Sequence, residues 1–158
     1  MSSEQQVTGI ISQIVDPEIP YLTIKELGIL RRVKQKGAHI TVVIAPTYLA
    51  CPATDAIEEE IISKLAAEGF SNVAVFKQFN PSWTTDWITA NGREKMRLYG
   101  VSPPEATSKA KCGASKNPVC PKCGASENES LNDVSGTVCK SLFRCLVCDE
   151  AFEHFKCL

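Results

Sequence analysis

The stretch PTYLACPATD, residues 46–55, lies between an apolar, β-branched run and an acidic, amphipathic segment. Pro52 suits the first position of a helix, where its missing N–H costs nothing. This predicts Cys51 at the helix N-cap, beside first-turn N–H groups and the positive end of the helix dipole. Such a setting favours the thiolate, the form of cysteine that binds metal or acts as a nucleophile. A small apolar side chain packed at a strand–helix corner is the open alternative.

Periodic patterns on both sides of this stretch predict an α/β (α+β) domain over residues 1–100. Asp16-Pro17 ends the first helical pattern, because the residue before a proline is pushed out of the α region. The turn at 35–38 predicts a β-hairpin. The order helix, hairpin, helix, strand predicts a small mixed sheet with packed helices. We expect these elements in chain order: helix 3–15, strands 29–33 and 39–45, helix 52–68 and strand 72–79.

Composition and charge narrow the class of protein. The chain has 158 residues, of which 44% are hydrophobic and 22% charged, with a net charge of −1. That balance gives no electrostatic bias toward nucleic acid or anionic membrane. No apolar run approaches the roughly 18 residues that span a bilayer, and the N-terminus lacks the pattern of a secretory signal. We therefore expect a cytoplasmic protein.

The eight cysteines are distributed unevenly, which predicts a second module. Cys51 is alone in the first 111 residues, and the other seven fall in the last 47. Residues 101–119, rich in Pro, Ala, Ser and Lys, are expected to be a linker. In a reducing compartment, clustered cysteines are metal ligands or reactive thiols more often than disulfides.

Two CxxC pairs, separated by 21 residues, occupy the last module, residues 120–158. This pattern is typical of a four-thiolate tetrahedral site, usually a structural zinc. The segment between the pairs has the pattern of short strands, so we predict a zinc ribbon that depends on its metal for folding. The predicted ligands are Cys120, Cys123, Cys145 and Cys148.

The remaining cysteines and the two tryptophans are further candidates for metal ligands or interface residues. Cys139 and Cys157 are either extra ligands, as in a binuclear or iron–sulfur site, or packed residues, and the role of Cys112 stays open. Trp83 and Trp87, four residues apart, are either core residues or anchors of a partner interface.

Several stretches resemble known families. DPEIP (16–20), IKELGIL (24–30) and PTYLACPATD resemble the domain of iron–sulfur assembly factors of the metal–sulfur cluster biosynthetic type. The more specific resemblance is to the PaaD family, the D component of the phenylacetyl-CoA epoxidase system, and it covers the chain from about residue 5 to the end. It rests on PSWTTDWITANGREKMRLYGVSPP (81–104), CPKCG (120–124) and GTVCKSLFRCLVCDEAFEHFKC (136–157).

The resemblance implies an accessory protein of aerobic phenylacetate catabolism, without catalytic residues of its own. Such a protein would mature or supply the iron or iron–sulfur centre of the oxygenase or its reductase. Cys51 matches the family's cysteine and is expected to contact iron or a cluster transiently. Asp16 matches the acid of the DPE motif and is expected nearby, with oxygens of Thr47 and Thr54 completing the surroundings.

Three other functions stay open. A non-catalytic structural adaptor of the oxygenase complex would use the tryptophans at its interface. A nucleic-acid-binding zinc ribbon is disfavoured because acidic residues balance the basic ones in the tail. A thiol enzyme lacks a partner base, since the only histidines are His39 and His154. Other components of the epoxidase are the expected partners, a homodimer is left open, and neither nucleic acid nor membrane is expected.

Overall fold

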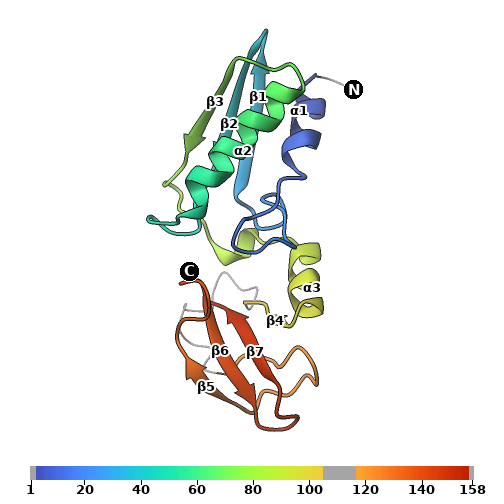
Figure 1. Cartoon of the computed structure of the whole chain (residues 1–158), viewed down its shortest axis with the longest axis vertical. Coiled ribbons are helices and arrows are strands. Elements are labelled where there is room, and N and C mark those ends of the chain that lie inside the picture. The colour runs from blue at the N-terminus through green and yellow to red at the C-terminus, as the bar shows by residue number, and fades with distance from the viewer. Residues whose placement is uncertain (1–2, 105–116, 157–158) are drawn as a thin grey trace. The chain divides into compact units, whose positions relative to one another are not determined.

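The computed structural model describes residues 3–104 and 117–156 and divides into two compact units, Met1–Trp83 and Thr84–Leu158. The first unit contains α1 (Ser3–Ile11), β1 (Leu30–Lys36), β2 (His39–Ile44), α2 (Ala53–Ala67) and β3 (Val73–Lys77) (Figure 1). The second contains η1 (Thr85–Trp87), α3 (Ala90–Leu98), β4 (Val101–Ser102), β5 (Asn128–Asn132), β6 (Lys140–Cys145) and β7 (Ala151–Phe155). Within the described ranges, no helix has the length and apolar character needed to cross a membrane.

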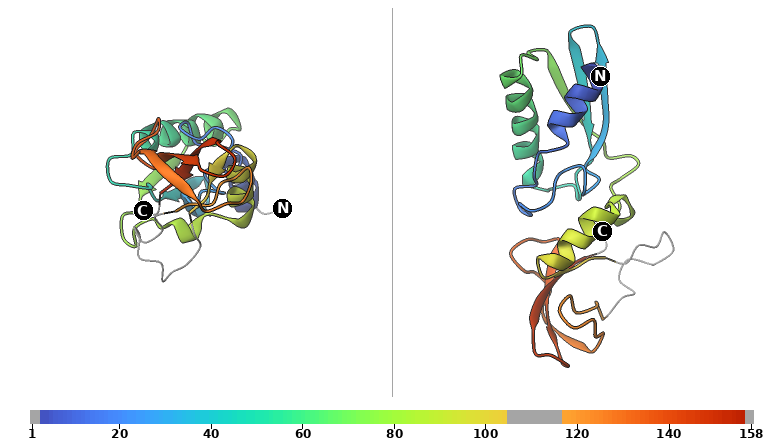
Figure 2. Two further views of the ribbon diagram at one scale, coloured as in Figure 1. Left: turned by 90° about the horizontal axis from the view of Figure 1, so that it is seen from below. Right: turned by 90° about the vertical axis from the view of Figure 1, so that its right-hand side faces the viewer.

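The first unit is a three-stranded mixed sheet with β2 at its centre. β1 and β2 form the predicted antiparallel hairpin, and β3 pairs with β2 in parallel. Both helices lie on one face of the sheet (Figure 2). Ile40, Val42 and Ile44 of β2 are fully buried beneath them, as period-two alternation requires. The predicted order of helix, hairpin, helix and strand is confirmed.

The first helix is shorter than the sequence pattern predicts. α1 ends at Ile11, whereas the apolar spacing predicted a helix to residue 15. Ile14 and Val15 instead belong to a tight loop, in which Val15 forms an isolated bridge with Thr23 and the Ile24 N–H donates to the Ile14 carbonyl over 2.9 Å. This pairing within the loop replaces the last helical turn, so helical spacing alone placed the end wrongly.

The end of α2 follows from a single glycine. Gly69 has a φ of +89° and donates to the Ala66 carbonyl, while the Phe70 N–H donates to Leu65. This is the Schellman arrangement, which favours glycine because of its positive φ. The sequence prediction that this helix ends at residue 68 agrees with the C-cap at Glu68.

The second unit is built on a four-stranded sheet in the order β4-β7-β6-β5. The hairpin of β6 and β7 carries the tail of the chain, and Phe152 and Phe155 are buried on it. Val101 and Ser102, which composition assigned to the linker, form β4 parallel to β7 and are buried. A two-residue strand has no periodicity, so the sequence carries no signal for it. α3 is capped by Thr89, whose side chain accepts from the Gly92 N–H.

Candidate metal centre

The four predicted zinc ligands converge in the second unit. Their sulfur atoms all lie within 4.8 Å of one another. The Cys120–Cys148 sulfurs are 3.8 Å apart, and the Cys123–Cys145 sulfurs are 3.5 Å apart. A tetrahedral site with metal–sulfur bonds of about 2.3 Å has its sulfurs about 3.8 Å apart. The donor set and its dimensions therefore fit one tetrahedral metal ion.

Two turns with the same hydrogen bonds bring the sulfurs together. In the first, the Cys120 N–H donates to Ala125 and the Gly124 N–H donates to Cys120. In the second, the Cys145 N–H donates to Glu150 and the Asp149 N–H donates to Cys145. Gly124 and Asp149, each directly after the second cysteine of a pair, have φ values of +77° and +65°. Glycine adopts such a positive φ without steric cost, and an aspartate does so less readily.

The pKa values of two of these thiols are shifted in opposite directions. A hydrogen bond from the Cys148 backbone lowers the pKa of the Cys145 thiol to about 7, against the effect of burial. At Cys123 the Ala125 backbone acts in the same direction, but burial and the neighbouring thiols outweigh it and raise the pKa of that thiol to about 12. A cation bound by all four sulfurs would displace the remaining protons, so metal affinity must rise with pH.

Cys139 and His154, which the structure does describe, lie outside this group. Cys139 is 3% exposed, and its sulfur lies 2.9 Å from the Thr137 hydroxyl. It is not one of the four clustered thiols. His154 contacts the Ser102 carbonyl through Nδ1 at 3.1 Å. Cys112 and Cys157 lie outside the described residues.

The other predicted site is Cys51, in the loop between β2 and α2. The helix begins at Ala53, one residue later than predicted, and Pro52 precedes it in the helical conformation. The Cys51 carbonyl accepts from the Thr54 N–H over 3.2 Å. Pro52 is therefore the N-cap, and Cys51 precedes it by one residue instead of occupying the N-cap as predicted. The Cys51 side chain is half-buried.

Cys51 lines a cavity of about 320 Å³. Thr54 is on its wall, as is Asp55, whose carboxylate accepts from Lys77 over 2.6 Å. Lys77 also pairs with Glu58 at 3.0 Å, and the hydrogen bonds to Asp55 and Glu58 raise the pKa of the lysine. Leu49 and Phe79, which are 86% and 49% exposed, contribute apolar walls. Sequence patterns did not indicate three of these lining residues, because they are separated in the chain or carry no ligand chemistry: Leu49, Lys77 and Phe79.

The remaining candidates are placed as follows. Asp16 is 4% exposed, and its Oδ1 accepts from the N–H groups of Glu18 and Ile19 over 2.8 and 3.0 Å. Asp16 and Thr47 are not among the described residues that line the Cys51 cavity. Thr47 is half-buried.

The two tryptophans do not share a helix face. Trp83 is 4% exposed, and its indole N–H donates to the Leu27 carbonyl over 2.8 Å within the first unit. This burial agrees with the core alternative for Trp83 and leaves little of it for a partner. Trp87 ends η1 in the second unit and is half-buried.

The fold and the clustered thiols together define a class: proteins with an iron–sulfur assembly-type domain followed by a zinc ribbon. Residues 4–75 match the family described as iron-sulfur cluster assembly protein, and residues 104–156 match the PaaD zinc beta ribbon domain. A protein of Escherichia coli (strain K12), provisionally named as the D component of 1,2-phenylacetyl-CoA epoxidase, is 41% identical over 97% of this chain and 92% of its own length. The chain belongs to the PaaD family.

More distant similarities cover the first unit. An "Fe-S protein maturation auxiliary factor" of Porphyromonas gingivalis is 29% identical over 56% of this chain and 86% of its own length. A solved structure of the domain of unknown function DUF59 from Bacillus anthracis has a TM-score of 0.55 at 18% identity, over 59% of this chain and 90% of that one. A conserved hypothetical protein of Thermotoga maritima gives 0.51 at 24% identity, over 60% and 93%. These two structures establish the fold alone.

Proposed function

We propose that this protein is an accessory component of the phenylacetyl-CoA epoxidase system that matures or supplies the system's iron or iron–sulfur centre. In this proposal Cys51 is the transient ligand of the iron or cluster, which is cargo. The observation that carries it is a half-buried cysteine that lines a cavity and is not a member of the four-thiolate group. The name of the similar E. coli protein supports a place in the phenylacetyl-CoA epoxidase system. The name of the similar P. gingivalis protein supports a role in iron–sulfur protein maturation.

The ligand chemistry at Cys51 suits release. Among the described residues, the only group of three or more His, Cys, Asp and Glu side chains with metal-binding spacing is the four-cysteine cluster. Stable protein sites for iron–sulfur clusters and zinc use four protein ligands or nearly so. Iron or a cluster at Cys51 would take its remaining ligands from elsewhere, so it could pass to another protein.

The four-thiolate site has a structural role in this proposal. Zinc is the metal that best suits four cysteine sulfurs in a closed tetrahedral site. Cys120 and Cys145 are themselves members of the small core that contains Phe152. Metal binding there would stabilise the second unit rather than take part in transfer.

A thiol enzyme is disfavoured by the surroundings of Cys51. Among the described residues that line its cavity there is no histidine to act as base. His39 lies at the start of β2, where Nδ1 is 2.9 Å from the Asn72 amide oxygen. We therefore assign no catalytic residue.

The test is to produce the epoxidase components together with wild-type protein or with Cys51→Ala. We expect Cys51→Ala to fold and keep its zinc, while the iron content and specific activity of the epoxidase fall severalfold. Cys139→Ala is the matched control, because it removes another cysteine thiol that is outside the metal cluster. Unchanged iron content and activity with Cys51→Ala would refute the proposed role. Stable stoichiometric co-purification with the oxygenase would then favour a structural adaptor.

A further inference from the structure

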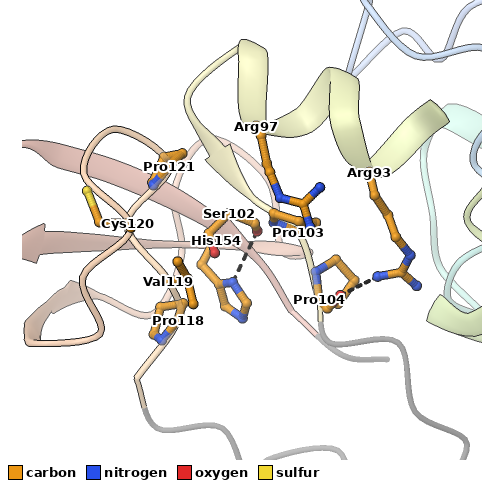
Figure 3. A pocket seen from close by; sticks show the side chains of 11 residues that line it. Arg93, Arg97, Ser102, Pro103, Pro104, Pro118, Val119, Cys120, Pro121 and His154 are labelled. Carbon is orange, nitrogen blue, oxygen red and sulfur yellow. Dashed lines mark hydrogen bonds between the residues drawn. The ribbon is translucent and has the colours of Figure 1, made fainter. Parts of the chain in front are cut away.

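The second unit contains a cavity of about 360 Å³ that the zinc ribbon and Cys51 leave unexplained (Figure 3). This volume falls within the range of small-molecule sites. Its walls come from α3, the segment after β4, His154 of β7, the segment before the first CxxC pair, and that turn itself, which includes the predicted zinc ligand Cys120. The walls combine two kinds of side chain: the apolar residues Pro103, Pro104, Pro118, Val119 and Pro121, and the polar residues Arg93, Arg97 and His154.

Arg93 is a buried cation that, in the described part of the chain, donates hydrogen bonds to carbonyl oxygens and is attracted electrostatically by Asp86. Its side chain is 9% exposed, and its guanidinium donates to the carbonyls of Thr85, over 2.6 Å, and Pro104. Two such bonds use only part of the five N–H donors of a guanidinium. Burial lowers the pKa of Arg93, against an opposing effect of Asp86. A buried charge is costly unless an opposite charge compensates it.

Arg97 adds a second positive charge to the same cavity. It lies one turn further along α3, and its charge lowers the pKa of Arg93 further. Its partner Glu94, at 3.1 Å, forms an exposed pair on the helix surface. Two cations that line one cavity repel each other unless an anion lies between them.

His154 lines the cavity and is held in a fixed orientation. Its Nδ1 is 3.1 Å from the Ser102 carbonyl, which can only accept, so Nδ1 carries a proton. The ring meets Phe143 edge-on, with centroids 6.0 Å apart and an interplanar angle of 84°. Because these contacts already hold the imidazole ring in place, a ligand that binds it does not have to immobilise the side chain.

We propose that this cavity binds a small organic acid. Its carboxylate would lie between Arg93 and Arg97, where the guanidinium fork matches two oxygens, and its apolar body would pack on the prolines. Inorganic phosphate shares the charge but has no apolar body, so it should bind more weakly. The site is separate from Cys51 and does not depend on the role proposed for that residue.

The test is calorimetric titration of the zinc-loaded full-length protein with benzoate, with inorganic phosphate as the comparison. We expect saturable benzoate binding with a Kd on the order of 1 mM or tighter and phosphate binding about tenfold weaker. Arg97→Gln should weaken benzoate binding about fivefold or more. The control is Lys95→Gln, which removes one positive charge from the same helix at a position not among the described lining residues and should change affinity less than about twofold.

Arg93→Lys is the second variant, because it keeps the charge but loses the planar fork. Weaker benzoate binding in this variant, with the circular dichroism spectrum and zinc content unchanged, would support the site. The proposal is overturned if benzoate does not bind saturably, if Arg97→Gln binds benzoate as wild type does, or if phosphate binds as tightly as benzoate.

Discussion

Asp16 shows how a motif residue can serve the fold before it serves any chemistry. Its carboxylate is buried, and one oxygen accepts the two N–H groups that shape the DPEIP loop. The family resemblance predicted that Asp16 lies near Cys51. A resemblance shows that a motif is shared, but it does not show whether the aspartate shapes a loop or contacts a metal. Local hydrogen bonding of an aspartate to the residues that follow it is a common way to fix such a turn.

The pH dependence of stability should reveal the buried carboxylate. Burial raises the pKa of Asp16 above 3.8, although the N–H groups of Glu18 and Ile19 oppose this. Between pH 3.8 and the raised value the folded protein binds more protons than the unfolded chain, so the free energy of unfolding falls as pH rises through that window. Asp16→Asn keeps an acceptor oxygen without the charge. Its stability relative to wild type should therefore improve from about pH 4 to about pH 7.

Urea unfolding can measure this in a Trp87→Phe background, where Trp83 of the first unit is the remaining tryptophan. Asp16→Ala is the control, because it leaves two N–H groups without their acceptor. It should cost about 1–3 kcal/mol at both pH values. If Asp16→Asn lost stability relative to wild type on going from the lower pH to the higher one, the carboxylate would not be penalised by burial.

At the scale of elements, the sequence predicted what periodicity and turn residues encode. The β1–β2 hairpin, α2 and the hairpin of the ribbon follow from alternating or helical apolar spacing, and the positive φ of Gly69 follows from its place after the helix. The end of α1 depends on the pairing of Val15 with Thr23, outside the helical segment, and the existence of β4 depends on pairing with Glu153, far along the chain. Local patterns carry no information on such partners.

The two CxxC turns invite a test of backbone conformation. Gly124 has a φ of +77°, and a Cβ added there would meet no atom within 4 Å. Gly124→Ala should therefore weaken metal binding through backbone strain alone, by about 1–2 kcal/mol or roughly tenfold in affinity. Competition with a chelator for zinc measures the change.

Gly136→Ala is the matched control, since Gly136 also has a positive φ, +70°, and open space but lies outside both CxxC turns. It should lower the stability of the ribbon while changing the zinc affinity of the folded protein less than Gly124→Ala does. Equal zinc affinity in wild type and Gly124→Ala would show that the turn does not need a left-handed residue.

At the scale of the whole molecule, the clustered cysteines lie in the second unit, and Cys51 lies in the first. The four-thiolate group was predictable because two CxxC pairs are the sequence pattern of a tetrahedral metal site, and in the structure the four sulfurs lie within 4.8 Å of one another. The cavities at Cys51 and Arg93 were not, because their walls come from separated segments such as Leu49 with Phe79, or Pro104 with Pro118. Both units match families named for metal chemistry, iron–sulfur assembly and a zinc ribbon.

The measurement that tests the central claim most directly is the metal content of anaerobically purified full-length protein, as wild type, Cys51→Ala and Cys120→Ala. Our account predicts about one zinc per chain in wild type and Cys51→Ala, and loss of zinc in Cys120→Ala. It also predicts that iron, taken up when offered, is retained by wild type and Cys120→Ala and lost from Cys51→Ala. Equal iron in wild type and Cys51→Ala, or no iron in any of the three, would contradict the account.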